Sequence, residues 1–128
     1  MKQLGVPPSS AMDAARLAEL LPISGSLTDA ATIAVGTPAH RAVLTVTLAG
    51  NRTLGNPSGT FLNGHQFQTV IRQDGTGSRT LAYGSDYAFS DSIPSPTLTT
   101  GASKTDTLGW QFDATKAKWI LLAINKGS

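Results

Sequence analysis

The two histidines come first in a search for chemistry, because a neutral imidazole can act as a base or bind a metal ion. His40 and His65 are the only histidines in the chain. Neither has the short spacing to another ligand that a metal site requires, and no serine lies in a nucleophile-elbow sequence that would complete a catalytic triad. Both flank expected loops, so the pattern favours solvated loop histidines over ligands or catalytic groups.

Asp86 and Asp91 are the second candidates, since a pair of carboxylates can hydrolyse a glycosidic bond or hold a calcium ion. They lie close together in a stretch rich in tyrosine and serine. The chain lacks the Asp-x-Asp-x-Asp loop with a downstream glutamate that binds calcium, and acids in such loops commonly cap turns. The sequence therefore predicts a protein that is not an enzyme and has no metal and no cofactor.

Aromatic rings supply the remaining candidate chemistry. Tyr83 and Tyr87 flank a glycine and a serine, and Asp91 follows them. Exposed rings at the lip of a loop can stack on sugar faces while a carboxylate accepts hydrogen bonds from sugar hydroxyls. These three residues are therefore a candidate glycan site, and the alternative is that the rings belong to the core. A core position is also expected for Trp110 and Trp119.

The composition limits the classes of partner. The chain has 128 residues, a formal net charge of +2 and no cysteine. Its basic residues are spread out and form no cluster that could follow a phosphate backbone, so we expect no nucleic-acid partner. No apolar run approaches the length that crosses a bilayer, so we expect no membrane insertion. The length suits one domain with its own core and no disulfides.

Residues 1–27 are predicted to form an arm and a short helix that serve as an attachment segment. Ser10 can cap a helix over residues 11–21, which Pro22 ends. A single amphipathic helix of this length is marginal in water, so it must pack on its own domain or on a partner. We expect it to contact the particle or neighbouring copies through Pro7, Pro8, Met12, Leu17, Leu20 and Leu21.

Residues 28–128 are predicted to form a β-sandwich module, because their apolar and polar residues alternate with the period of two that is typical of strands. The strand at 79–83 is expected to pair back on 66–73 as a hairpin. The resulting fold class is all-β, an antiparallel two-sheet sandwich or a jelly-roll-like barrel with one short N-terminal helix. The main expected strands cover residues 32–35, 42–48, 66–73, 79–83, 105–112 and 118–125.

A doubled phrase is the most informative pattern in the chain. Gly50-Asn51-Arg52-Thr53-Leu54 returns as Gly77-Ser78-Arg79-Thr80-Leu81, preceded by Gln73-Asp74-Gly75-Thr76. Glycine and small polar residues before a short β-prone run indicate repeated turns. With Pro94-Ser95-Pro96-Thr97-Leu98, Lys104-Thr105-Asp106 and Lys118-Trp119, these phrases resemble a β-rich module of tailed-bacteriophage virion proteins, over about residues 28–125.

The resemblance implies a non-enzymatic structural role on the virion surface, after synthesis in the host cytoplasm, and assembly as a homotrimer. Such modules usually lie at the far end of long fibres, whereas here the module fills nearly the whole sequence. We therefore expect a capsid decoration or head-fibre protein that docks on the major capsid protein or another virion protein. The alternative is a receptor-binding tail-fibre or spike tip that recognises a host surface glycan.

Overall fold

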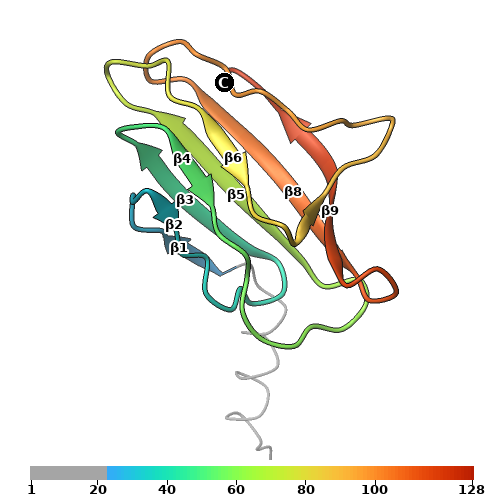
Figure 1. Ribbon diagram of the computed structural model, residues 1–128. Coiled ribbons are helices and arrows are strands. Elements are labelled where there is room, and N and C mark those ends of the chain that lie inside the picture. Colours follow the sequence, from blue (N-terminus) through green and yellow to red (C-terminus); the bar gives the residue numbers. More distant parts are fainter. Residues whose placement is uncertain (1–22) are drawn as a thin grey trace, which may run out of the picture.

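A computed structural model describes residues 23–128 of the chain (Figure 1). This part is rich in strands and contains no helix. The predicted N-terminal helix and the predicted attachment residues, from Pro7 to Leu21, lie outside the described residues. The strands are β1 (Ser24–Ser26), β2 (Thr32–Ile33), β3 (Ala42–Leu48), β4 (Arg52–Leu54), β5 (Gln66–Gln73), β6 (Leu81–Tyr83), β7 (Tyr87–Ala88), β8 (Thr105–Asp113) and β9 (Lys118–Asn125).

The strands form two sheets between which the chain alternates. The large sheet has six strands in the order β1-β3-β5-β8-β9-β7, and the small sheet has three in the order β2-β4-β6. Up to β6, odd-numbered strands therefore join the large sheet and even-numbered strands the small one. In the large sheet β3 lies between β1 and β5, and in the small sheet β4 lies between β2 and β6. The long strands β3, β5, β8 and β9 run side by side (Figure 1).

The prediction that the sheets are antiparallel is wrong for most of the pairings. The pairs β1–β3, β3–β5, β2–β4, β4–β6 and β7–β9 are parallel, and within residues 23–128 only β5–β8 and β8–β9 are antiparallel. The reason, for the four parallel pairs among β1 to β6, is the alternation between sheets. A strand that returns to the same sheet after a detour through the other one runs in its original direction.

The expected hairpin between residues 66–73 and 79–83 is also absent. Gly77 and Ser78 both have positive φ angles, +75° and +61°, and they turn the chain away from β5. As a result β6 joins the small sheet, where it pairs in parallel with β4. A side chain at position 77 would also collide with neighbouring backbone, which explains the glycine there.

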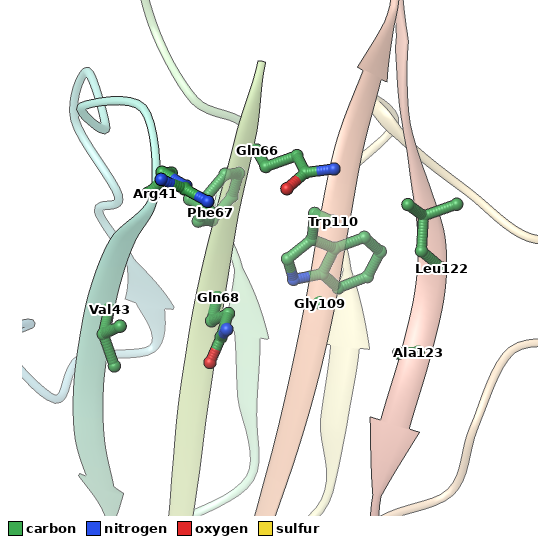
Figure 2. A pocket seen from close by; sticks show the side chains of 9 residues that line it. All are labelled: Arg41, Val43, Gln66, Phe67, Gln68, Gly109, Trp110, Leu122 and Ala123. Carbon is green, nitrogen blue, oxygen red and sulfur yellow. The ribbon is translucent and has the colours of Figure 1, made fainter. Parts of the chain in front are cut away.

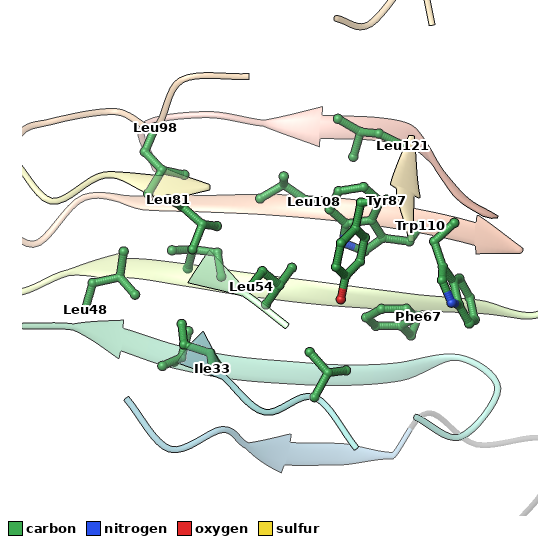
Figure 3. Packing of buried hydrophobic residues seen from close by; sticks show 14 of the residues in the cluster. Ile33, Leu48, Leu54, Phe67, Leu81, Tyr87, Leu98, Leu108, Trp110 and Leu121 are labelled. Atoms are coloured by element: carbon green, nitrogen blue, oxygen red, sulfur yellow. The ribbon is translucent and has the colours of Figure 1, made fainter. Parts of the chain in front are cut away.

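One hydrophobic cluster contains buried residues of both sheets (Figure 3). The small sheet contributes Ile33, Leu54 and Leu81, which are at most 9% exposed. The large sheet contributes the inward-facing residues of its long strands, including Trp110 and Trp119, each 1% exposed. The expectation that both tryptophans lie in the core is confirmed.

The doubled phrase supplies two arginines, one in β4 and one just before β6, and each forms an ion pair. Arg52 donates from Nε and Nη2 to the two carboxylate oxygens of Asp29, at 2.8 and 2.9 Å. Arg79 donates from Nη2 to Asp74 Oδ2 at 2.8 Å. Bidentate pairs of this kind fix geometry as well as adding energy. The repeated arginines therefore hold turns together.

Two buried polar side chains tie the later loops to the large sheet. Gln73, 4% exposed, donates from Nε2 to the carbonyl oxygens of Arg79 and Thr99 and accepts from the Arg79 amide, each at 2.9 Å. Asp106, 2% exposed, accepts from the amides of Thr99 and Gly127 at 2.7 and 2.8 Å. Their polar atoms are thus paired, as buried groups must be to avoid a large desolvation cost.

Candidate functional site

The predicted glycan residues do not form an exposed aromatic lip. Tyr87 is 6% exposed, its ring lies against Trp110 with centroids 4.6 Å apart, and its hydroxyl donates to the carbonyl oxygen of Gly55 at 2.8 Å. Burial raises the pKa of the Tyr87 phenol well above its ordinary value, with a smaller contribution from Asp86. A sugar needs a free ring face for stacking, and Tyr87 instead occupies the core position that the sequence left open as the alternative.

Tyr83 is half-buried, and Asp91 is exposed. The Tyr83 ring contacts that of Phe89, with centroids 5.1 Å apart, and its hydroxyl donates to the carbonyl oxygen of Pro96 at 3.3 Å. Burial raises the pKa of Tyr83 above its ordinary value, and the charge of Asp106 adds to the shift. Both tyrosines therefore use their hydroxyls within the fold.

The two histidines lie together but are already engaged in structural hydrogen bonds. Their ring centroids are 5.3 Å apart. His40 Nδ1 accepts from the amide of Gln66 at 3.1 Å, and His65 Nε2 lies 2.9 Å from the carbonyl oxygen of Pro38, which requires this nitrogen to donate. Within residues 23–128 no group of three or more histidine or acidic side chains is placed to hold a metal ion.

The most extensive candidate surface is the side of the large sheet that faces away from the hydrophobic cluster. Side chains alternate along a strand, so the residues between the buried ones point to this side. We call it the outer face. Its residues are Val43, Thr45, Thr47, Gln66, Gln68, Val70, Arg72, Thr105, Thr107, Gly109, Gln111, Asp113, Lys118, Ile120, Leu122, Ala123 and Asn125.

The outer face is hollowed near its centre. The hollow has a volume of about 490 Å³, and Figure 2 shows Gly109 between Gln68 on one neighbouring strand and Leu122 and Ala123 on the other. A Cβ atom added at Gly109 would meet nothing nearer than 3.8 Å, so the missing side chain leaves open space above the strand. Glycine inside a strand often marks a place where another molecule approaches closely.

A bulge in β9 raises an apolar side chain beside this hollow. Gly109 pairs with Ala123 and Trp110 pairs with Leu121, so Leu122 is the extra residue on its strand. Leu122 is consequently 48% exposed, whereas its neighbour Leu121 is 1% exposed. The bulge thus exposes Leu122 to solvent beside the hollow that Gly109 and Ala123 line.

Charge is scarce on the outer face. Its charged residues lie at its two ends, with Arg72 at one end and the cross-strand partners Asp113 and Lys118 at the other; Arg41 lies at the rim of the hollow. Lys118, at the start of β9, donates from Nζ to the carbonyl oxygen of Ser85 at 2.6 Å. Between these cations the surface carries amides, hydroxyls and small apolar groups, and Gln66 Nε2 donates to Gln111 Oε1 at 2.7 Å. Solvated protein surfaces usually carry more charge than this.

The sequence indicates this surface through uncharged residues at the outward positions of its strands. Thr45, Thr47, Gln66 and Gln68 occupy the polar positions of alternating strands, where lysine and glutamate are common, yet all are uncharged. Charge depletion is typical of the centres of protein interfaces. The exposure of Leu122 carries no such signal, because the bulge depends on how β8 and β9 pair.

No protein-family model, curated protein or solved structure matches this chain. Within residues 23–128 the structure has no helix that is long and apolar enough to cross a membrane.

Proposed function

We propose that this protein is a non-enzymatic structural protein of a bacteriophage virion surface, either a capsid decoration or a head-fibre protein. In this proposal residues 28–128 form a sandwich-like body that self-associates, as the homotrimer implied by the resemblance or in another stoichiometry. Residues 1–27 attach this body to the major capsid protein or to another virion protein. The resemblance of the doubled phrase and its flanking motifs supplies the class of particle.

The observation that carries the structural role is the broad, charge-poor outer face. A sheet face that is meant for water usually carries lysine and glutamate at its outward positions, and contact surfaces are depleted of charge. The two sheets share one buried cluster, and buried side chains such as Gln73 and Asp106 satisfy their hydrogen bonds internally. A body with one face whose centre carries no charge is suited to packing in an assembly.

The alternative function, a receptor-binding tip that recognises a host glycan, has less support. Tyr87 is buried and the Tyr83 hydroxyl is engaged with Pro96, so Asp91 alone of the three candidate residues is freely exposed. A glycan array with the purified protein tests this alternative. Binding that is lost on Asp91→Ala would favour the receptor role over the structural one.

Particle association tests the proposed function. Purified particles from cells that produce this protein should contain it at a fixed copy number, measured by quantitative mass spectrometry, and antibody labelling should locate it on the particle surface. Its absence from purified particles would refute the virion role.

The role of the N-terminal segment is tested in the full chain. The double variant Leu17→Asp, Leu21→Asp replaces two of the expected attachment residues by charged ones and should abolish attachment to particles. The control Glu19→Gln changes a residue of the same segment that is not an expected attachment residue, and it should attach like the wild type. If the double variant attaches normally while its circular dichroism is unchanged, the docking assignment is wrong.

A further inference from the structure

We infer that the outer face packs against the outer face of a second copy of this chain. The inference rests on the proposed function only in taking the protein to be an assembly component, and it adds the surface through which copies meet. Four features of the described residues support it: the hydrogen-bonding chemistry of the face, its size, its relief, and the protection of the sheet edges.

The chemistry of the face is self-complementary. A glutamine amide and a threonine hydroxyl each contain both a donor and an acceptor, so two identical rows of such groups can satisfy one another. A face with charges of one sign at its centre would repel its own copy. The central residues Gln68, Thr107 and Gly109 are uncharged, whereas Arg72 lies at one end of the sheet and Asp113 and Lys118 lie at the other. Charges at those ends remain in water when two faces meet at their centres.

The size of the face is adequate for a concentration-dependent association. Four long strands spaced about 4.8 Å apart, each with about seven residues rising about 3.3 Å, cover roughly 450 Å² in projection. Two copies would thus bury about 900 Å² before the relief of the side chains is counted. Specific interfaces begin at about 1,200 Å² in total. The face alone therefore predicts an association at the weaker end of the range.

The face has one protruding side chain, Leu122, and one hollow beside it. Leu122 protrudes because of the bulge in β9, and the hollow over Gly109 and Ala123 is open beside it. When two such faces meet about a twofold axis, each leucine can enter the hollow of the other copy, as an isologous contact requires. This contact buries the exposed leucine and fills the space that the glycine leaves.

The edges of the sheets offer a poorer route to association. The large sheet ends in β1, with three residues, and β7, with two, and the small sheet ends in β2 and β6, with two and three. Such short edge strands are a common protection against edge-to-edge pairing. Within residues 23–128 the outer face is therefore the favoured contact surface.

The experiment measures the oligomeric state of the full-length protein by sedimentation velocity and light scattering, from about 1 µM to about 1 mM. The wild type should pass from monomer to oligomer within this range. Leu122→Asp and, separately, Gln68→Glu should each weaken self-association by at least about tenfold. The control Leu62→Asp changes a leucine that is 82% exposed on a loop, and it should leave association unchanged.

A wild type that stays monomeric over the whole range would overturn the inference. An oligomer that neither face variant weakens would also overturn it, as would one that Leu62→Asp weakens to the same extent. Saturable binding of a neutral glycan to the face of a protein that remains monomeric would overturn it as well. Far-ultraviolet circular dichroism and urea midpoints establish that the variants fold, and Gln68→Glu, at an exposed position, keeps the test valid if Leu122→Asp does not. The assay uses no particles, so its failure is separate from failure of the virion role.

Discussion

Replacing Gln73 by glutamate should make the stability of this protein depend on pH. The two side chains have nearly the same shape, but a carboxylate cannot donate. In the wild type Nε2 of Gln73 donates to the carbonyl oxygens of Arg79 and Thr99. In the variant a carboxyl oxygen faces those two acceptors in a site that is 4% exposed. Burial and the facing oxygens both raise the pKa of the introduced carboxyl above its ordinary value of about 4.3.

The sign and size of the effect follow from these contacts. A folded-state pKa above the unfolded value means that stability is fully present below about pH 4 and is lost as pH rises through the folded pKa. At neutral pH the variant lacks two hydrogen bonds, worth about 1 kcal/mol each, and carries a buried charge beside carbonyl oxygens. We therefore expect a loss of about 2–4 kcal/mol at pH 8 and a smaller loss at pH 4.

Urea unfolding followed by tryptophan fluorescence at pH 4 and pH 8 measures the difference. The slope is about 1–3 kcal/mol per molar urea. At pH 8 the urea midpoint of the Gln73→Glu variant should therefore lie roughly 1–3 M below that of the wild type. At pH 4 the two midpoints should lie closer together. The control Gln68→Glu makes the same chemical change on the exposed outer face and, at monomeric concentrations, should show almost no such loss. Equal destabilisation of Gln73→Glu at both pH values would refute the reasoning.

Three further changes test other parts of the fold. The pKa of Asp74 is lowered to about 2, chiefly by its hydrogen bond with Arg79 and then by backbone amides. The wild type therefore has stability above about pH 4 that it loses toward pH 2, and Asp74→Asn should remove this contribution. Urea midpoints measured from about pH 5 to about pH 2 test this, and a variant whose midpoint falls with pH as steeply as that of the wild type would contradict it. Gly77→Ala puts a Cβ atom 2.6 Å from a backbone oxygen at a φ of +75° and should cost about 2 kcal/mol or more, whereas Gly75→Ala meets nothing within 4 Å and should be nearly neutral in thermal melts. Thr69→Val leaves the indole N–H of Trp110, now 3.0 Å from the Thr69 hydroxyl, unpaired in the core and should cost about 1–3 kcal/mol; a urea midpoint equal to that of the wild type would show that this bond contributes nothing.

The long strands could be predicted from the sequence, but their neighbours could not. Alternation over residues 42–48 and 66–73 identifies β3 and β5 to the residue, because a period of two defines which side chains share a face. The continuous apolar run within residues 118–125 likewise predicts β9 with its observed bounds. Alternation contains no information on direction. The parallel pairing of β3 with β5 depends on the intervening β4, which takes the chain into the other sheet.

The candidate site was predicted less well, for a related reason. The spacing of Tyr83 and Tyr87 shows that two rings lie near one turn, but the side to which each ring points depends on the sheet that its strand joins. Tyr87 lies on β7, which pairs with β9 and turns its ring inward against Trp110. The outer face has a sequence signal in its uncharged polar positions, whereas the exposure of Leu122 follows from a bulge that only the pairing reveals.

The order in which strands join the large sheet has a consequence for synthesis on the ribosome. The pairs β1–β3 and β3–β5 connect segments close together in the nascent chain, so they can form early. The other edge of β5 is covered only when β8 emerges and Phe67 pairs with Trp110. Until then the eight residues of β5 present unpaired amides and carbonyls, a template for pairing with other chains. A translational pause between residues 88 and 105 would prolong that exposure, which makes this interval the stage of synthesis most dependent on chaperones.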